Sequence, residues 1–318
     1  MAKVMITGTA GFIAYHLALS LMRDGHEVCG FDNFNDYYDV RLKNERSRLL
    51  RQAGVNIIYT DLTHKPAVEF FLKEQKPDVV MHLGAYVGVR HSLEQPMKCI
   101  SDNIIGTHNL IKACNKAGVN KVIYASTSCV MAGNDLPWKE EDKLGYQLNP
   151  YGYTKATNES QFMTSSLEFA IGLRFFTVYG SWGRPDMALF NFTKNIIKGN
   201  PIKLFNYGDM IRDFTHINDI VQGIKIIINR VNNSPKPLKE VYNIGYGEKV
   251  QLMDFVTEIE KNVGKEAIKD FVEKHPADTQ TTWSDTTKLQ ALGYKPTTSI
   301  KQGVANFVEW YKDYYEVM

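Results

Sequence analysis

Short apolar runs typical of β-strands alternate with helical patterns through the first half of the chain. The runs are KVMIT (3–7), EVCGF (27–31), VNIIY (55–59), DVVMHL (78–83), KVIYAS (121–126) and GLRFFTV (172–178). The helical patterns lie around 11–24, 66–75, 95–118 and 151–169. Several runs are almost continuously apolar, which indicates strands buried on both faces of a parallel sheet. Strand–helix alternation favours right-handed βαβ units, so the predicted fold class is α/β with a doubly wound parallel sheet.

After residue 178 the pattern changes to loops and short amphipathic helices. We expect helices near 187–198, 216–230 and 251–263, and a last helix within TTSIKQGVANFVEWYKDYY whose aromatic residues belong to a core. The polar stretches 33–54 and 229–240 are expected at the surface, the first as a solvated lid or helix and the second as a linker. The predicted organisation is a dinucleotide-binding domain over 1–178, to which 214–245 returns, and a smaller, mainly substrate-binding α/β domain over 179–318.

The composition excludes several classes of protein. A chain of 318 residues with 44% hydrophobic and 23% charged residues is typical of a globular protein of one large or two coupled domains. A formal net charge of +2 gives no field suited to nucleic acid or an anionic membrane. No apolar run approaches the length that spans a membrane, and the four cysteines form neither a C-x-x-C motif nor a disulfide framework. We therefore expect a cytoplasmic protein with reduced thiols and no metal site.

A glycine-rich turn follows the first predicted strand and opens a helix. In ITGTAGFIAYHL, Gly8 permits a tight turn, Gly11 permits close approach of a phosphate, and the small Ala14 permits helix–strand packing. The N-terminus of the helix then faces a pyrophosphate. The sequence thus predicts a Rossmann-like dinucleotide site.

Acidic residues end the second strand and follow the third. Asp32 lies 21 positions after Gly11, where an acid binds ribose hydroxyls and repels a 2′-phosphate, so NAD is favoured over NADP. A turn-capping role is the alternative for Asp32. Asp61 is placed to reach the adenine edge, with capping of a helix as an equally open reading.

The stretch NPYGYTKATNES (149–160) puts two tyrosines ahead of one lysine. Asn149 is suited to be an N-cap and Pro150 a first helical residue. Tyr151 and Lys155, four apart, then share a helix face, whereas Tyr153 points away. The helix N-terminus and the ammonium both favour the phenolate. Tyr151 is therefore the candidate base, and a surface pair is the alternative.

The combination of motifs resembles the extended short-chain dehydrogenases/reductases of the NAD-dependent epimerase/dehydratase family. The likeness is carried by Gly8–Gly11–Ala14, ASTS (125–128), Tyr151-x-x-x-Lys155 and RDFTHINDI (212–220). More narrowly, the chain resembles UDP-glucuronate 4-epimerases, and this likeness runs along nearly the whole chain. It is carried by DNFNDYYDVRLKNER, GVRHSLEQP, LRFFTVYGSWGRPDMALF and LGYKPTTSI.

The resemblance implies an isomerase that retains NAD. Tyr151 would take the proton of the sugar 4-hydroxyl while NAD⁺ accepts the hydride from C4, and the 4-keto sugar would rotate and regain the hydride on its other face. Lys155 would bind the nicotinamide ribose and lower the pKa of Tyr151. Thr127 matches the hydroxyl partner, with Ser126 and Ser128 as rival assignments.

Further positions follow from the same resemblance. Cofactor-binding residues would be Gly8, Ala10, Gly11, Phe12, Ile13, Asp32, Asn33, Asn35, Asp61, Leu62, Leu83, Gly84, Ala85, Tyr86, Asn103 and Ser126, together with Tyr151 and Lys155. Substrate-binding residues would be Arg90, Thr127, Ser128, Thr177, Arg184, Phe205, Asn206, Tyr207, Arg212 and Asp278. Among these, Phe205, Asn206 and Tyr207 would flank the uracil, Arg212 would meet the diphosphate, and Asp278 would lie near the uridine ribose. Two ligand groups are possible for Arg184, the substrate carboxylate and the diphosphate.

Three departures from the family pattern stand out. Ala14 replaces the usual third glycine, Met131 and Ala132 replace a tyrosine–glycine pair, and HPADT (275–279) has alanine where glycine is usual. The STS stretch lacks the Asp–Glu pair of related dehydratases, which counts against loss of water. The function implied is reversible 4-epimerisation of UDP-glucuronate. The alternatives are epimerisation of UDP-glucose or UDP-N-acetylglucosamine, decarboxylation of UDP-glucuronate, and, from another class, a silent dinucleotide sensor. The family also suggests a homodimer through the helices near 95–118 and 151–169.

Overall fold

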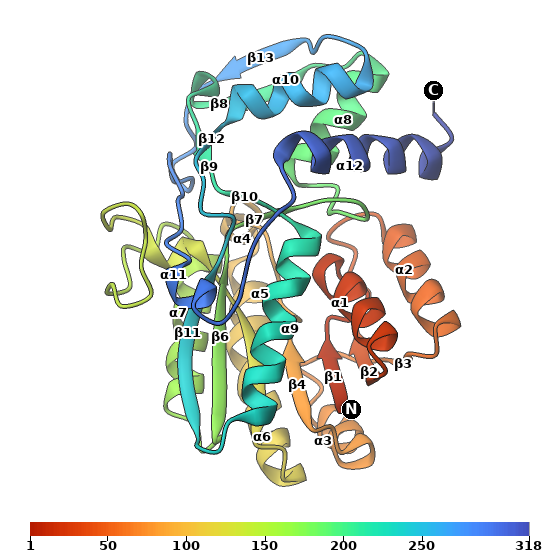
Figure 1. The fold of residues 1–318 in the computed structure, drawn as a ribbon, viewed down its shortest axis with the longest axis vertical. Coiled ribbons are helices and arrows are strands. Elements are labelled where there is room, and N and C mark those ends of the chain that lie inside the picture. Colours follow the sequence, from red (N-terminus) through yellow and green to blue (C-terminus); the bar gives the residue numbers. More distant parts are fainter. Residues whose placement is uncertain (318) are drawn as a thin grey trace.

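A seven-stranded parallel sheet forms the centre of the protein, which we describe over residues 1–317 from a computed structural model. Figure 1 shows the sheet in the lower part of the molecule, with the strand order β11-β6-β5-β4-β1-β2-β3. The strands are β1 (Lys3–Thr7), β2 (Glu27–Asp32), β3 (Asn56–Tyr59), β4 (Val79–His82), β5 (Lys121–Thr127), β6 (Phe169–Phe175) and β11 (Leu238–Ile244). The chain runs outward from β1 in one direction and then restarts on its other side with β4. The predicted doubly wound α/β fold is confirmed.

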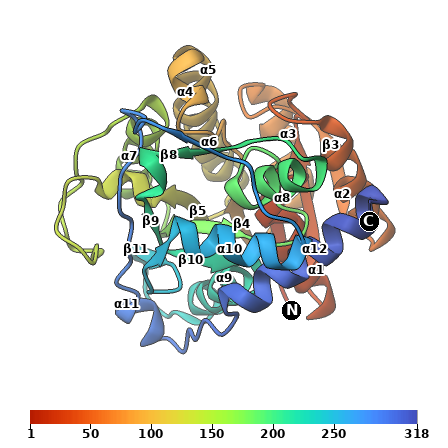
Figure 2. The same ribbon diagram turned by 90° about the horizontal axis from the view of Figure 1, so that it is seen from above.

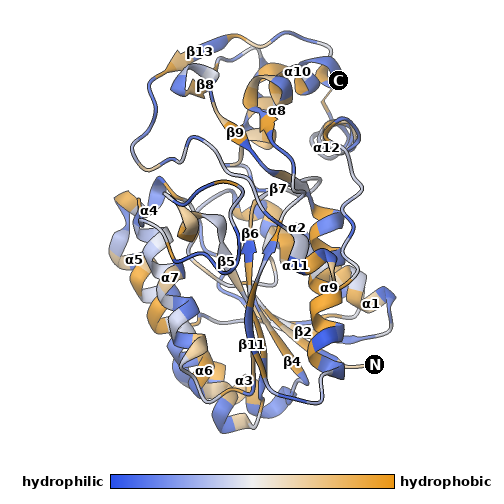
Figure 3. Ribbon diagram, turned by 60° about the vertical axis from the view of Figure 1, so that its left-hand side comes forward, coloured by the Kyte–Doolittle hydropathy of each residue, from blue (hydrophilic) through white to orange (hydrophobic). Residues whose placement is uncertain are grey.

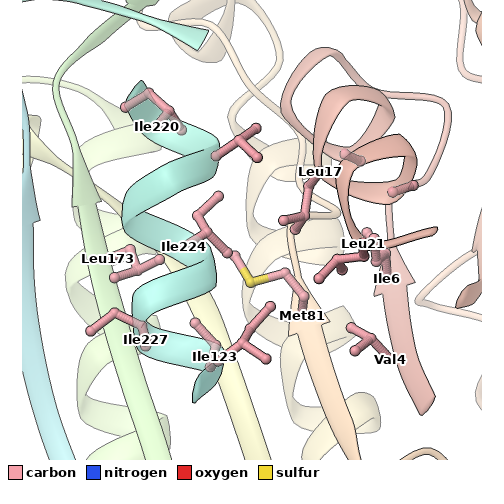
Figure 4. Packing of buried hydrophobic residues seen from close by; sticks show 14 of the residues in the cluster. Val4, Ile6, Leu17, Leu21, Met81, Ile123, Leu173, Ile220, Ile224 and Ile227 are labelled. Carbon is pink, nitrogen blue, oxygen red and sulfur yellow. The ribbon is translucent and has the colours of Figure 1, made fainter. Parts of the chain in front are cut away.

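Helices cover both faces of the sheet. Successive residues of each strand point to opposite sides, and both sets are apolar, so each face needs a layer of helices. Val4 and Ile6 pack toward one group of helices, which includes α1 (Phe12–Arg23) and α9 (Ile217–Asn233). Figure 4 shows α9 and α1 meeting over the sheet, with Ile220, Ile224 and Leu17 between them. Met5 points to the other group, which includes α3 (Lys65–Gln75) and α6 (Gly106–Ala117). The central strands accordingly carry the hydrophobic colour in Figure 3.

The other helices of this half lie in the insertion after β2 and in the segments that follow β4 and β5. Helix α2 (Val40–Gln52) lies in the polar insertion, and α7 (Pro150–Met163) follows β5 along the chain. Two short helices, α4 (His91–Glu94) and α5 (Pro96–Ile100), lead into a π-helical turn, η1 (Ser101–Ile105), and then into α6. A 3-10 turn, η2 (Ser128–Met131), ends β5.

A second hydrophobic core lies above the carboxyl ends of the strands in Figure 1. It joins α8 (Ala188–Lys198), α10 (Leu252–Val263) and α12 (Ile300–Tyr315), and Figure 2 shows α10 and α12 side by side. Phe307 and Tyr311 of α12 are buried there, so the prediction of a core role for its aromatic residues is confirmed. The small elements of this half are β7 (Thr177–Tyr179), β8 (Ile202–Phe205), η3 (Asn206–Gly208), β9 (Ile211–Arg212), β10 (Phe214–His216), β12 (Val250–Gln251), β13 (Lys269–Val272) and α11 (Thr287–Gln290).

Several predicted boundaries are wrong. The helix expected over 151–169 ends at Met163, and β6 begins at Phe169. The helix expected over 95–118 is broken into α5, η1 and α6. The stretch 229–240, predicted to be a linker, contains the end of α9 and the start of β11, which pairs in parallel with β6. As an edge strand, β11 tolerates polar residues such as Lys239 and Glu240, which hid it from a search for apolar runs.

The polar insertion is not wholly solvated as predicted. Its helix α2 turns Leu42, Arg46 and Leu50, spaced four apart, toward the interior, where all three are buried. Lys43 is also buried. The insertion is therefore a packed part of the molecule.

Candidate active site

A cavity of about 1100 Å³ lies between the carboxyl ends of the parallel strands and the second core. It includes the point where the strand order reverses between β1 and β4, the place where open α/β sheets bind their ligands. Most of the residues predicted to bind ligands line it: Gly8, Gly11, Phe12, Ile13, Asp32, Asn33, Asn35, Asp61, Leu62, Leu83, Gly84, Ala85, Tyr86, Arg90, Ser126, Thr127, Ser128, Tyr151, Lys155, Thr177, Arg184, Phe205, Arg212 and Asp278. Ala10, Asn103, Asn206 and Tyr207 are not among its lining residues.

The glycine-rich turn leaves bare backbone on the cavity. Gly8 has a positive φ of 70°, and a Cβ there would lie 2.8 Å from the Cα of Gly84, at the loop that follows β4. A Cβ at Gly11 would lie 2.9 Å from the carbonyl oxygen of Gly8. Gly11 is also the N-cap of α1 and has no side chain with which to cap it. The helix N-terminus and the tight turn thus fit the pyrophosphate of a dinucleotide, which approaches backbone N–H groups closely.

Asp32 is held in place by backbone groups. Its carboxylate accepts hydrogen bonds from the N–H groups of Ala10, at 3.0 Å, and Phe34, at 2.7 Å. Burial raises the pKa of Asp32 above its ordinary value, although these two bonds and Lys43 act in the opposite direction. The acid that ends β2 is thereby tied to the glycine-rich turn and faces the cavity, as a contact with a ribose requires.

Asp61 does not cap α3, whose N-cap is His64, but closes a local turn at the wall of the cavity. Its carboxylate accepts from the N–H and hydroxyl of Thr63, at 2.8 and 2.6 Å, just before α3 begins. Asn33 donates to its other oxygen at 2.6 Å, and both residues line the cavity. Burial by itself would raise the pKa of Asp61, but the bonds from Asn33 and Thr63 hold it below its ordinary value.

Helix α7 begins as predicted. Asn149 is its N-cap and accepts from the N–H of Gly152 at 2.8 Å, and Pro150 is the first helical residue. Tyr151 and Lys155 both line the cavity, whereas Tyr153 does not. The predicted helix register is therefore confirmed.

The electrostatics of this pair differ from the prediction. Burial raises the pKa of Tyr151 well above its ordinary value, and among the neighbours that oppose the rise are Arg184 and a hydrogen bond with Thr127. Burial lowers the pKa of Lys155 to about 8. The Lys155 ammonium donates to the carbonyl oxygen of Ala125 in β5 at 3.0 Å. The prediction of a favoured phenolate is not borne out for the groups that the chain itself supplies, because burial outweighs the lowering effects of Arg184 and Thr127 on the pKa of Tyr151.

The three hydroxyl groups that end β5 have different surroundings. Ser126 donates to the carboxylate of Glu159 at 2.6 Å, and Glu159 forms a buried two-pronged ion pair with Arg174 of β6. Thr127 accepts from the N–H of Cys129 at 3.2 Å, which leaves its own proton available. The Ser126 hydroxyl is thus occupied within the fold, which favours Thr127 and Ser128 as the groups that contact a ligand.

Asn103 supports the cavity wall from behind. It lies in the π-helical turn η1, and its side-chain carbonyl accepts from the N–H of Tyr86 at 2.7 Å. Its amide donates to the carbonyl of Tyr86 and to the hydroxyl of Thr154, both at 3.0 Å. Asn103, predicted as a cofactor-binding residue, uses its side-chain amide to brace the loop after β4 against α7.

Two arginines are paired with acids on the substrate side. Arg184 donates to Asp186 at 3.0 and 2.5 Å, and the Tyr37 hydroxyl donates to the same carboxylate at 2.9 Å. Arg90 forms an ion pair with Asp278 at 2.6 Å, and its guanidinium lies 3.5 Å above the centre of the Phe205 ring.

Arg212 donates at 2.8 Å to the carbonyl oxygens of Ile211 and Gln280. These bonds fix its guanidinium beside the Arg90–Asp278 pair, whose charges act on it in opposite directions. Asn206 and Tyr207 lie in the turn after β8 with positive φ values of 51° and 54°, and 62% of Tyr207 is exposed. The structure does not bring these two residues into the cavity.

Sequence reasoning missed several residues that shape the site. Lys43 lines the cavity and donates to Asn35, and Tyr37 and Asp186 hold Arg184. Glu159 could have been found from its spacing, because it lies four residues after Lys155 and eight after Tyr151 on the same helix face. The Tyr37–Asp186 bond carries no comparable signal, since it joins the loop after β7 to the distant insertion.

Two further findings concern residues 1–317 as described. No group of three or more His, Cys, Asp and Glu side chains in this range lies close enough to hold a metal ion. Nor is any helix in it long and apolar enough to cross a membrane.

Comparison with known proteins gives consistent matches along the chain. A model of the NAD dependent epimerase/dehydratase family matches residues 4–245. Protein CapI of Staphylococcus aureus is 39% identical, over 99% of each chain. A probable UDP-glucuronate 4-epimerase of Rhizobium meliloti (strain 1021) is 37% identical, over 98% of each chain. The crystal structure of UDP-glucuronic acid 4-epimerase from Bacillus cereus, in complex with UDP-glucuronic acid and NAD, superimposes with a TM-score of 0.91 at 33% identity, over 98% of this chain and 100% of that chain.

Proposed function

Because this chain belongs to the NAD-dependent epimerase/dehydratase family, we propose that it is a UDP-glucuronate 4-epimerase that interconverts UDP-glucuronate and UDP-galacturonate through a 4-keto intermediate. The proposal rests on one structural observation above all. Tyr151, Lys155 and Thr127 line the same cavity as the glycine-rich turn and Asp32, so a sugar and a dinucleotide can meet there.

The residues of the cavity fit NAD as the resident cofactor. Gly8 to Ile13 would hold the pyrophosphate, Asp32, Asn33 and Asn35 the adenosine ribose, and Asp61 and Leu62 the adenine. Leu83 to Tyr86 and Lys155 would hold the nicotinamide end, with Ala10 and Asn103 acting from behind through their bonds to Asp32 and Tyr86. A carboxylate at 32 favours NAD over NADP. Bound there, NAD supplies a hydride acceptor for C4 and returns the same hydride.

Tyr151 is the proposed acid–base group. In its phenolate form Tyr151 would take the proton of the sugar 4-hydroxyl, and the resulting phenol would later return that proton to the 4-keto oxygen. Burial raises the pKa of Tyr151, so the phenol holds its proton firmly until positive charge gathers around it. The Lys155 ammonium, fixed on the Ala125 carbonyl, supplies part of that charge. Thr127 is the proposed hydroxyl partner at the end of β5.

The sugar carboxylate needs a pocket of its own. A 4-keto glucuronate is a β-keto acid, which loses CO₂ unless the carboxylate charge is stabilised in the ground state. Thr127, Ser128 and Thr177 are the hydroxyl donors that we assign to this pocket, with Arg184 at the mouth as its cation. The Asp186 carboxylate already binds Arg184 through Nε and Nη2, so the sugar carboxylate would use the remaining Nη1 donors or compete with Asp186.

The nucleotide is assigned to the substrate side of the cavity. Phe205 would stack on the uracil, Asp278 would bind the uridine ribose, and Arg212 and Arg90 would meet the diphosphate. We therefore propose that residues 1–178 and 214–245 carry the dinucleotide, whereas the rest of 179–318 mainly binds the nucleotide sugar. The pairing of β11 with β6 and the separate second core support this division.

A homodimer and a cytoplasmic location complete the proposal. The helices near 95–118 and 151–169 would form the dimer contact, and the exposed side chains of Met97, Ile105 and Met163 support that surface. All four cysteines are free thiols, and three are buried, as expected in a reducing compartment.

The function is tested with purified enzyme and a panel of UDP-sugars, with the products identified by NMR. We expect UDP-glucuronate and UDP-galacturonate to interconvert without added NAD. The double variant Ser128→Ala, Thr177→Val should weaken UDP-glucuronate more than UDP-glucose and release some UDP-pentose. Fast turnover of UDP-glucose alone would identify a neutral-sugar epimerase, and UDP-pentose as the sole product of the unaltered enzyme would identify a decarboxylase.

A further inference from the structure

Arg46 of α2 is a fully buried cation that is bonded to neutral groups. It has 0% exposure, and within residues 1–317 it forms no ion pair, unlike its neighbour Arg48. Its guanidinium donates to the carbonyl of Ala10 at 3.0 Å, the hydroxyl of Tyr38 at 2.8 Å, the carbonyl of Gly183 at 3.2 Å and the carbonyl of Trp182. A buried charge is costly unless it is hydrogen-bonded. Since the Nε of Arg46 has no partner in the described part of the chain, the four acceptors of Nη1 and Nη2 carry this stabilisation.

The acceptors of Arg46 belong to both sides of the cavity. Ala10 lies in the glycine-rich turn, and its own N–H donates to Asp32. Trp182, whose φ is 61°, and Gly183 immediately precede Arg184. One planar guanidinium therefore ties the proposed dinucleotide turn to the loop that carries the proposed carboxylate-binding arginine. A lysine ammonium cannot reproduce this fork, because it presents its donors from a single atom.

We infer that Arg46 is a positioning residue that sets the distance between the dinucleotide and the sugar carboxylate by holding residues 8–13 and 181–187 in one register. The inference rests on the proposed function, because it takes NAD and UDP-glucuronate as the two ligands. Consequently, a substitution of Arg46 should weaken the binding of both NAD and UDP-glucuronate. The uridine end is spared, because Phe205, Arg212 and Asp278 are held by other contacts.

The test compares Arg46→Lys with the unaltered enzyme and with Arg48→Met. Arg48 is on the same helix but is exposed and pairs only with Glu45 among the described residues, so its replacement is a matched control. Tyr38→Phe removes a single acceptor of Arg46 and remains informative if Arg46→Lys folds poorly. For each purified protein we would measure the NAD content per chain and the Kd values of UDP-glucuronate and UMP.

We expect Arg46→Lys to retain less NAD and to bind UDP-glucuronate roughly tenfold or more weakly, as for loss of one hydrogen bond to a charged group, with UMP unchanged. Tyr38→Phe should lower the NAD content and weaken the binding of UDP-glucuronate by smaller amounts. Arg48→Met should change neither quantity. A fall in melting temperature with unchanged NAD content, or an equal loss for UDP-glucuronate and UMP, would overturn the inference. If the unaltered enzyme binds UDP-glucuronate no better than UMP, the substrate assignment fails instead. In that case the positioning role is tested by amide hydrogen exchange. Exchange in Arg46→Lys must be faster than in the unaltered enzyme in both 8–13 and 181–187.

Discussion

Tyr151 and Tyr153 are two residues apart in one helix, and only Tyr151 lines the cavity. Tyr151→Phe removes the proton acceptor and should lower kcat by about 10²- to 10⁴-fold, the usual size of a general acid–base contribution. The NAD content should be nearly unchanged. Tyr153→Phe should stay close to the unaltered rate. Turnover of UDP-glucuronate by both variants tests this, and reversed rates would show that the roles are exchanged.

The pKa of Lys155 allows a prediction of how the rate depends on pH. Burial lowers its pKa to about 8, so the ammonium is present below that pH and is lost above it. If the cation is needed to activate Tyr151, kcat/KM should fall as the pH rises past about 8. Lys155→Arg, which keeps its charge, should be slower but should lack this alkaline decline. A rate that climbs steadily to pH 10 would contradict the assignment, because such a rise reports deprotonation of the high-pKa tyrosine.

At the scale of elements, the ion pair between Glu159 and Arg174 joins α7 to β6 and orients Ser126 at the end of β5. Both side chains are less than one-tenth exposed. Arg174→Met leaves the Glu159 charge buried and unpaired, which should lower the free energy of unfolding by about 3–5 kcal/mol. The double variant Arg174→Met, Glu159→Met should recover part of this loss.

Urea denaturation measures the effect of breaking this pair. Arg48→Met, which breaks an exposed pair on α2, serves as a control and should leave the free energy of unfolding nearly unchanged. A cost for Arg174→Met as small as that of the control would show that the buried pair does not hold α7 on the sheet.

At the scale of the whole molecule, the proposed cycle returns the hydride that it takes. The purified enzyme should therefore contain NAD and should turn over UDP-glucuronate without added cofactor and without accumulating NADH. Because NAD would contact the loops after β1, β2, β3 and β4, the loaded enzyme should also melt at a higher temperature than enzyme with a lower NAD content. Absorbance at 340 nm detects accumulated NADH, assay of the cofactor released from the protein gives the NAD content, and thermal melts compare loaded with depleted enzyme. A lasting need for stoichiometric NAD⁺ would indicate a dehydrogenase.

Much of the architecture could be predicted because it depends on local patterns. Apolar runs marked β1 to β5 to within a residue or so, and Asn149 with Pro150 marked the start of α7. The edge strand β11 was missed because its first four residues are only partly buried and include Lys239 and Glu240, so it lacks a continuous apolar run. The breaks at η1 and at Met163 were also missed, because neither η1 nor the stretch 163–168 contains a proline or glycine.

The sequence by itself determined the chemistry of the site: a glycine turn before a helix, an acid after the second strand, and a tyrosine and lysine on one helix face. These follow from spacing along a single element, which fixes directions without knowledge of the rest of the fold. The tertiary structure alone decided that the Ser126 hydroxyl is occupied by Glu159 and that Tyr37 braces the Arg184–Asp186 pair. It also decided the balance of protonation, because the pKa of Tyr151 depends on burial by distant segments. The role of Arg46 is of the same kind, since its partners come from loops that are far apart in the sequence and meet only when the sheet and the second core are assembled.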